Sequence, residues 1–67
     1  MVVHLDPKWT KHLEASPESG MGYQLVDVTL RSGEHLSKLP VFNGEYLEVP
    51  DSVTFEASAI ELIELHR

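Results

Sequence analysis

The fold of this chain is decided by the stretch YQLVDVTLRSGEHLSKL, residues 23–39. In its first half, the apolar residues of Val-x-Val-x-Leu (26–30) alternate with polar ones. A period of two is typical of a half-buried β-strand. Ser32 and Gly33 follow the strand and fit a two-residue hairpin turn. The stretch therefore predicts two antiparallel strands joined by a tight turn.

Charge supports one register for this hairpin. Centring it on Ser32-Gly33 places Arg31 opposite Glu34 and Asp27 opposite Lys38. Each of these cross-strand pairs has opposite charges and contributes about 0.2–1 kcal/mol. The same register places Leu39 on the face of the apolar residues. Hydrophobic pattern and charge pattern therefore predict the same pairing.

A short helix is expected before the strands. Asp6 followed by Pro7 favours a helix start, because an Asp side chain caps free N–H groups and proline at the first helical position loses no hydrogen bond. Trp9 and Leu13 are one turn apart on one face. We predict a helix over residues 7–15 that packs on the sheet, followed by a loop over residues 16–22 that contains Pro17 and two glycines.

A second hairpin is predicted at Asn43-Gly44, a pair that accepts the positive φ angles of a tight turn. A two-residue turn here places Val41 and Tyr46 on one face and Phe42 on the other. Either both faces of the sheet are covered, or the strand bends near Pro40. We favour the bend, which turns Phe42 back into the core and helps the sheet to curl.

The rest of the chain completes a β-rich domain. Residues 53–55 fit a short strand. Residues 58–66 fit a helix, through the capping-box pattern Ser58-Ala-Ile-Glu61, or a closing strand, and we favour the strand. The expected fold class is mostly β (α+β): a single domain over residues 1–67, with a short N-terminal helix and then a strongly bent, four- to five-stranded antiparallel sheet in a barrel-like region over residues 23–66.

Composition narrows the possible functions. The 67 residues provide one modest core. The net charge is −6, and residues 41–67 hold six acidic groups but one basic group. This charge argues against nucleic-acid binding, which needs clustered Lys and Arg. The absence of cysteine favours a reducing, cytoplasmic setting, and no apolar run approaches the ~20 residues of a membrane helix.

Four stretches carry a resemblance: SGMGYQ (19–24), V-x-V-x-L-x-x-G (26–33), FNGE (42–45) and F-x-x-x-x-I-x-x-I (55–63). Together they resemble a group of short, uncharacterised bacterial proteins, a likeness that implies no particular activity. The β-rich part is also distantly similar to small barrels of the Sm-like and SH3-like kind, in which a helix precedes five strongly bent strands. Bacterial Sm-like RNA chaperones carry a Tyr-Lys-His run near the end, which residues 65–67 (Leu-His-Arg) do not reproduce. Ring assembly and RNA binding are therefore not implied.

No residue is predicted to be catalytic, to bind a cofactor or to ligate a metal. The four histidines lack H-x-x-x-H or comparable spacing. We expect His12 on an exposed helix face and His4 and His66 near frayed ends. His35 is expected beside the first turn, with the core face next to Leu30 as a further alternative. A core of this size also leaves little volume for an enclosed active site.

The sequence instead favours a non-catalytic module for protein–protein contact or self-assembly. The sheet has more apolar side chains than one short helix can cover. We predict a contact surface that contains Met21, Tyr23, Val41 and Tyr46, because methionine and tyrosine suit half-wet, adaptable surfaces. The expected partner is a second copy of the chain or another protein. An Sm-like RNA-binding barrel is the alternative, and it depends on fold analogy alone.

Overall fold

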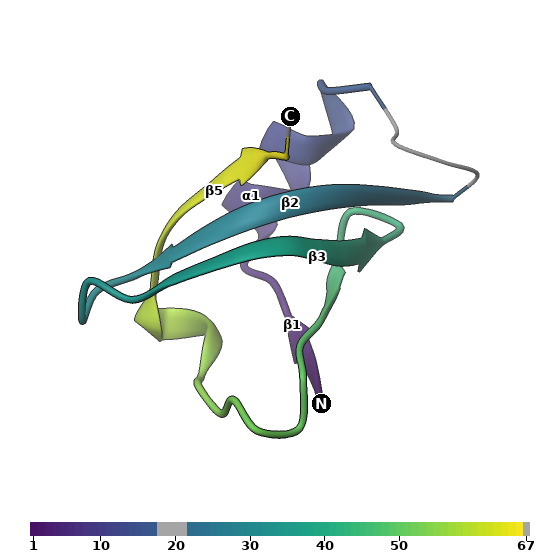
Figure 1. The fold of residues 1–67 in the computed structure, drawn as a ribbon. Helices are drawn as coiled ribbons and strands as arrows, with labels where there is room; N and C mark the ends of the chain where they lie inside the picture. Colours follow the sequence, from purple (N-terminus) through teal and green to yellow (C-terminus); the bar gives the residue numbers. More distant parts are fainter. Residues whose placement is uncertain (18–21, 67) are drawn as a thin grey trace.

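The computed structural model describes residues 1–17 and 22–66 (Figure 1). The strands β1, β4, β3, β2 and β5 lie in that order in a single sheet, and every neighbouring pair is antiparallel. Along the chain, the elements are β1 (Val2–His4), α1 (Pro7–Glu14), β2 (Tyr23–Leu30), β3 (His35–Phe42), β4 (Tyr46–Glu48), the 3₁₀ turn η1 (Ala57–Ala59) and β5 (Ile60–Leu65).

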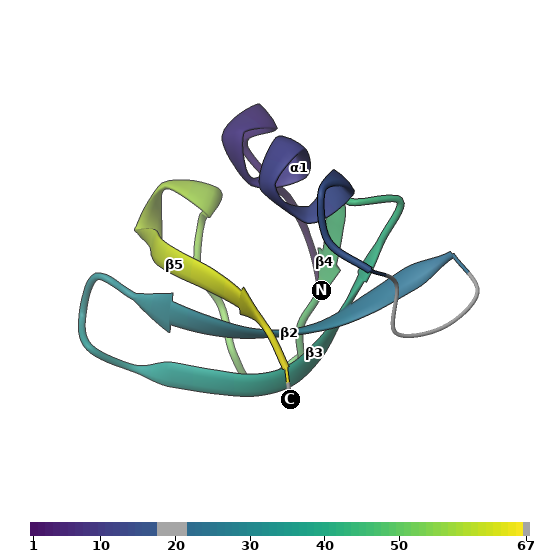
Figure 2. The same ribbon diagram turned by 90° about the horizontal axis from the view of Figure 1, so that it is seen from above.

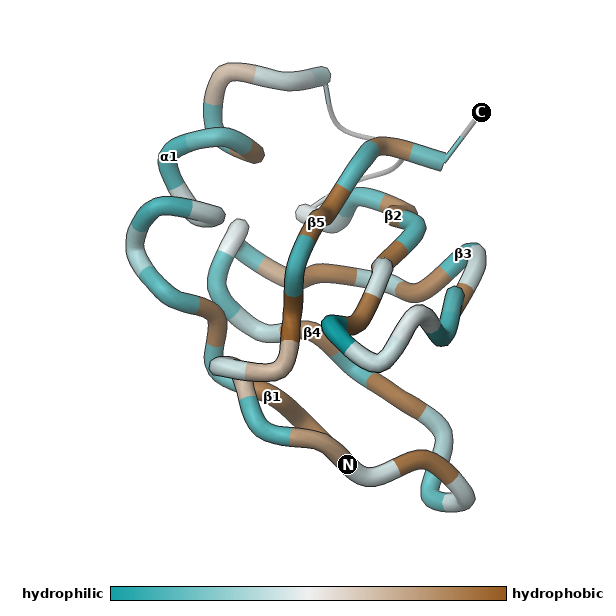
Figure 3. Tube along the Cα trace, turned by 90° about the vertical axis from the view of Figure 1, so that its left-hand side faces the viewer, coloured by the Kyte–Doolittle hydropathy of each residue, from teal (hydrophilic) through white to brown (hydrophobic). Residues whose placement is uncertain are grey.

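The sheet curls into a half-barrel, and α1 lies across its open side (Figure 2). This arrangement confirms the predicted fold class, a short helix combined with a strongly bent antiparallel sheet. Along β5, single acidic residues interrupt the apolar ones (Figure 3). The concave face and the helix together enclose the core, whose buried members are Val3, Leu5, Leu13, Val26, Val28, Leu30, Leu39, Val41, Leu47, Val49, Ile60 and Ile63.

Helix α1 begins as its sequence predicts and ends one residue earlier. The Asp6 carboxylate accepts a hydrogen bond from the Lys8 N–H at 3.0 Å, and Pro7 occupies the first turn. Leu13 is buried, and Trp9 packs against the core while staying partly exposed. Eight residues are too few for a stable helix in water, so this packing holds α1 in place. Among the described residues, no helix has the length and apolar character that a membrane crossing requires.

The buried amide of Gln24 links α1 to the sheet. Its Nε2 donates to the carbonyl oxygen of Leu13 at 2.8 Å and lies 3.2 and 3.3 Å from those of Ser16 and Pro17. The last carbonyls of a helix have no partner within the helix. One strand side chain therefore ties the end of α1, and the two residues of the following turn, to the sheet.

The first hairpin has the predicted strands but a longer turn. Its loop contains three residues, 31–33, because the Leu30 N–H donates to the Glu34 carbonyl. The predicted Arg31–Glu34 pair is therefore wrong, and Arg31 instead donates from Nε to the Ser58 carbonyl at 2.9 Å. Further along, Val26 faces Leu39 as predicted, because the register shifts between Val26 and Val28.

That register shift is a β-bulge opposite Asp27. Val26 pairs with Leu39 and Val28 with Leu36, so two residues of β3, Ser37 and Lys38, lie opposite one residue of β2. Lys38 has a φ of 59°. Its backbone N–H donates to Asp27 Oδ1 at 3.0 Å. Asp27 and Lys38 do meet across the hairpin, but through this backbone hydrogen bond.

The second hairpin also has a three-residue loop. Asn43 and Gly44 both have the positive φ that was predicted, 55° and 69°. Phe42 pairs with Tyr46, however, so residues 43–45 form the loop. The predicted bend that returns Phe42 to the core is wrong, because the extra loop residue already places Leu47 on the core face with Val41.

The structure adds one strand that was not predicted and lacks one that was. Strand β1 was not predicted, and it pairs with β4. Residues 53–55 are not a strand. The strand favoured for residues 58–66 is confirmed as β5, where the capping-box residues give only the single 3₁₀ turn η1.

Candidate functional site

Four rings lie side by side across the outer, convex face of the sheet. His4 on β1 pairs with Tyr46 on β4, Tyr46 pairs with Phe42 on β3, and Phe42 pairs with Tyr23 on β2. We call these four residues the aromatic row. The rings of His4 and Tyr46 stack with centroids 5.3 Å apart, and those of Tyr23 and Phe42 are tilted at 6.3 Å. Directly paired residues share a face of the sheet, so four strands contribute to one surface.

The alternation of each strand determines that the row faces outward. The residues next to its members along the chain, Val3, Gln24, Val41 and Leu47, are all buried on the concave face. Successive side chains of a strand point to opposite faces. Tyr46 is therefore 42% exposed and Phe42 39% exposed, although both are large and apolar. His4 is also exposed, and Tyr23 is partly buried.

A second set of mostly apolar side chains borders the row. Val2, which is 59% exposed, pairs with Glu48, and Leu25 pairs with Pro40. The aromatic row and these four residues thus form a patch that is apolar except for one carboxylate, on Glu48, and one imidazole, on His4. Further along β2 and β3, the same face carries polar residues, among them Asp27, Thr29 and His35. Exposed apolar surface that is continuous across several strands is typical of an interaction site.

The structure separates the four predicted contact residues. Tyr23 and Tyr46 lie in the aromatic row. Val41 is completely buried, so its prediction as a contact residue is wrong. Met21 lies outside the described residues. Sequence reasoning missed Phe42, which it assigned to the core.

His4 was also missed. The only signal for its position is the alternation of Val2, Val3 and His4, because β1 has just three residues. So short a pattern does not identify a strand without its partner.

A second group of polar side chains lies where β5 ends. His66 Nδ1 is 2.8 Å from Asp27 Oδ1, which also accepts the Lys38 N–H. The hydrogen bond from the Lys38 backbone, followed by that from His66, holds the pKa of Asp27 below its ordinary value. These contacts attach the end of β5 to the bulge of the first hairpin.

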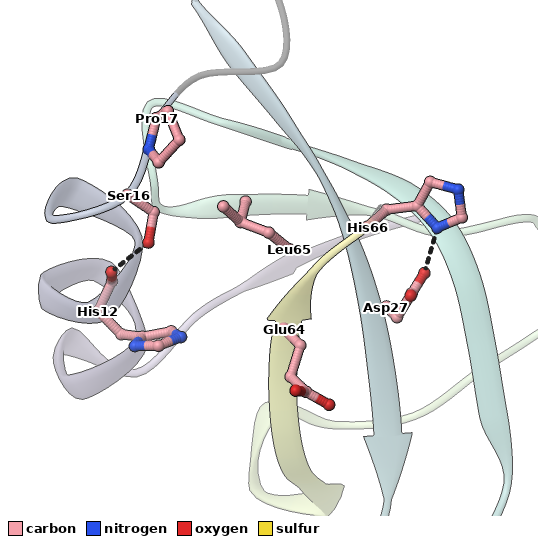
Figure 4. Close-up of a pocket in the computed structure, with 7 residues that line it drawn as sticks. All are labelled: His12, Ser16, Pro17, Asp27, Glu64, Leu65 and His66. Atoms are coloured by element: carbon pink, nitrogen blue, oxygen red, sulfur yellow. Dashed lines mark hydrogen bonds and ion pairs between the residues drawn. The ribbon is translucent and has the colours of Figure 1, made fainter.

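An open hollow of about 920 Å³ lies beside this pair (Figure 4). The Ser16 hydroxyl at its wall donates to the His12 carbonyl, at 3.1 Å. Within residues 1–17 and 22–66, no three His, Asp or Glu side chains are grouped so that they could hold a metal ion. His12 is exposed as predicted, whereas His35 is exposed rather than on the core face and lies 3.1 Å from the Thr29 hydroxyl.

Comparison with models of protein families, with curated proteins and with solved structures found no significant match to this chain. The surfaces described above are therefore the basis for any functional assignment.

Proposed function

We propose that this protein is a non-catalytic self-assembly module, whose subunits associate through the aromatic row. The observation that carries the proposal is the exposure of Phe42 and Tyr46 at the middle of a four-strand face. Large aromatic side chains provide most of the binding energy at the centres of protein interfaces. The proposal includes the cytoplasmic setting expected from the absence of cysteine.

The chemistry of the face suits contact with a second copy. A two-fold contact brings the same patch of both subunits together, so the patch must not repel itself. The aromatic row and its border have a single carboxylate, Glu48, and an imidazole, His4, in an otherwise apolar patch. A standard interface covers about 800 Å² per partner, which is less than a fifth of the 4430 Å² accessible surface of the subunit. A face spanning four of the five strands has room for such a contact.

Aromatic side chains on a sheet also stack on the bases of single-stranded nucleic acid. That mode of binding needs a basic groove along the strand, which the residues of this face do not provide. Among the described residues, Lys8 and Lys11 are on α1, on the opposite side of the sheet, and Arg31 is in the first hairpin turn. Lys38 is the single Lys or Arg on the strands of this face, and it lies at the bulge beside the carboxylate of Asp27. Charge therefore favours protein over RNA as the partner.

The proposal is tested by measuring the mass of the natural chain and of Tyr46→Glu by light scattering at tens of micromolar. We expect a mass above 7.5 kDa for the natural chain and a monomer for Tyr46→Glu, because a charge at the centre of the interface would be buried without a partner. Leu62→Glu is the matched control, since Leu62 is also 42% exposed but lies on β5. Its mass should equal that of the natural chain.

Circular dichroism of each variant must show an unchanged β spectrum. A monomeric natural chain would refute self-assembly. If the natural chain bound an oligouridine at low salt and Tyr46→Glu did not, the aromatic row would instead be assigned to RNA.

A further inference from the structure

Strand β5 forms one edge of the sheet and is the longer of the two edge strands. It has six residues, whereas β1 at the other edge has three. An edge strand presents a row of N–H and C=O groups that are not paired within the sheet, and such a row is a template for another strand.

The hydrogen bonds of β5 identify which groups point outward. The His66 N–H donates to the Leu25 carbonyl at 2.8 Å, and Glu64 pairs with Asp27 in the same register. In an antiparallel ladder, hydrogen-bonded and non-hydrogen-bonded pairs alternate. The backbone N–H and C=O groups of Ile63 and Leu65 therefore point away from β2. No hydrogen bond recorded within the described part of the chain takes up these two N–H groups.

The space next to this edge is open. The hollow of about 920 Å³ lies between α1 and the end of β5, with His12, Ser16 and Pro17 on the helix side and Glu64 and Leu65 on the strand side (Figure 4). An extended segment thus has access to the outward-pointing backbone groups.

Charge indicates what kind of segment fits. The carboxylates of Glu64 and Asp27 both line the hollow, and β5 itself, IELIEL, has two acidic residues and no basic one. A second copy of β5 would bring the same negative charges to the ladder. A basic segment would be attracted, which also favours its association rate.

We propose that the outer edge of β5 binds an extended segment of another protein that has a basic residue two positions from an apolar one. The segment adds to the sheet as a sixth strand. Glu64 is hydrogen-bonded toward β2, so across the new ladder it occupies a non-hydrogen-bonded position, where side chains come closest. A lysine or arginine opposite Glu64 then pairs with its carboxylate, and the apolar residue lies opposite the exposed Leu62. This edge is separate from the aromatic row, which does not include β5.

The test uses the acetylated and amidated heptapeptide KTVTKTV, in which Lys and Val alternate on one face. Its binding is followed by the amide spectrum and hydrogen exchange of the full chain. At a peptide concentration about ten times the Kd, exchange of the Ile63 and Leu65 amides should slow by about tenfold. The amides of β1 should not change. A peptide with the same sequence but N-methylated on its three threonines, which face Ile63 and Leu65, should not bind, because it cannot donate the ladder hydrogen bonds.

Two variants of equal charge change test the ion pair. Glu64→Lys should raise the Kd for KTVTKTV by about three- to tenfold, because an attraction is lost and a repulsion is added. Glu34→Lys, in the first hairpin turn, should leave the affinity unchanged. The measurement is repeated in Tyr46→Glu, so that failure of self-assembly does not affect the result. The proposal is overturned if the Ile63 and Leu65 amides do not respond to KTVTKTV, if the N-methylated peptide binds equally well, or if both charge variants weaken binding equally.

Discussion

Both hairpins of this sheet have a three-residue loop where two residues were predicted, but the effect on the following strand differs. In the first hairpin, the bulge at Ser37 and Lys38 compensates for the extra residue, so Val26 still faces Leu39. In the second hairpin nothing compensates, and Phe42 pairs with Tyr46 instead of Glu45. Since side chains alternate between faces with a period of two, a one-residue difference exchanges the core and solvent faces of the following strand.

This difference determines where the exposed aromatic surface lies. With a two-residue turn at Asn43-Gly44, Tyr46 would share the core face with Val41. With three residues, Leu47 takes that place and Tyr46 joins Phe42 on the convex face. The length of one loop therefore assigns the aromatic side chains to the surface.

The largest expected effect tests the phase of β4 directly. Leu47→Ala should lower the free energy of unfolding by about 2–5 kcal/mol, because Leu47 is fully buried and the substitution leaves a cavity. Tyr46→Ala, one residue away, should cost less than about 1 kcal/mol in a monomeric background, since that side chain faces solvent. Urea denaturation at a concentration below self-association measures both. If Tyr46→Ala were the more damaging change, the two-residue turn would be correct.

A smaller effect distinguishes the two turns themselves. Gly33 and Gly44 both have positive φ, and a side chain in that region costs about 1–2 kcal/mol. A Cβ at Gly33 meets no atom within 4 Å, whereas one at Gly44 lies 3.6 Å from Thr10 Cγ2 under α1. Gly44→Val should therefore lower the free energy of unfolding by about 1–3 kcal/mol more than Gly33→Val, because the valine side chain is crowded against α1. Equal melting temperatures for the two variants would contradict the contact between α1 and the second turn.

The smallest effect concerns the bulge of the first hairpin. The folded state lowers the pKa of Asp27. Its ionised form therefore contributes stability that is present above the unfolded pKa of about 3.9 and is lost as pH falls through the lower, folded value. Asp27→Asn should destabilise the chain by less than about 1 kcal/mol at neutral pH, because the group is exposed. The difference in melting temperature between the two chains should shrink below about pH 4, and a constant difference down to pH 2 would exclude this contribution.

Local signals in the sequence predicted much of the fold. The Asp6-Pro7 start, the period-two pattern of residues 26–30 and the positive φ of Asn43 and Gly44 all depend on residues close in the chain. Strand β1 could not be predicted in this way, because three residues form a strand only through their pairing with β4. The two loop lengths also depend on tertiary contacts, such as those of Arg31 with the segment before β5.

The candidate site was predicted less completely, for the same reason. Tyr23 and Tyr46 were identified as exposed because tyrosine suits surfaces. Val41 and Phe42 were assigned to the wrong faces, since an incorrect loop length led to a compensating bend at Pro40. The edge of β5 required the order of the strands, which no local pattern contains.

The pairing of β1 with β4 has a consequence for the order of folding. Each residue of β1 pairs with one more than forty positions away along the chain, whereas β2 and β3 are joined by a short turn. Closing a long loop costs more entropy and is slower. We expect β2 and β3 to associate early, bringing Tyr23 and Phe42 together, and β1 to dock last with His4. Reversible detachment of β1 would then open only the half of the aromatic row that contains Tyr46, and the amides of β1 would be the first of the sheet to exchange with solvent.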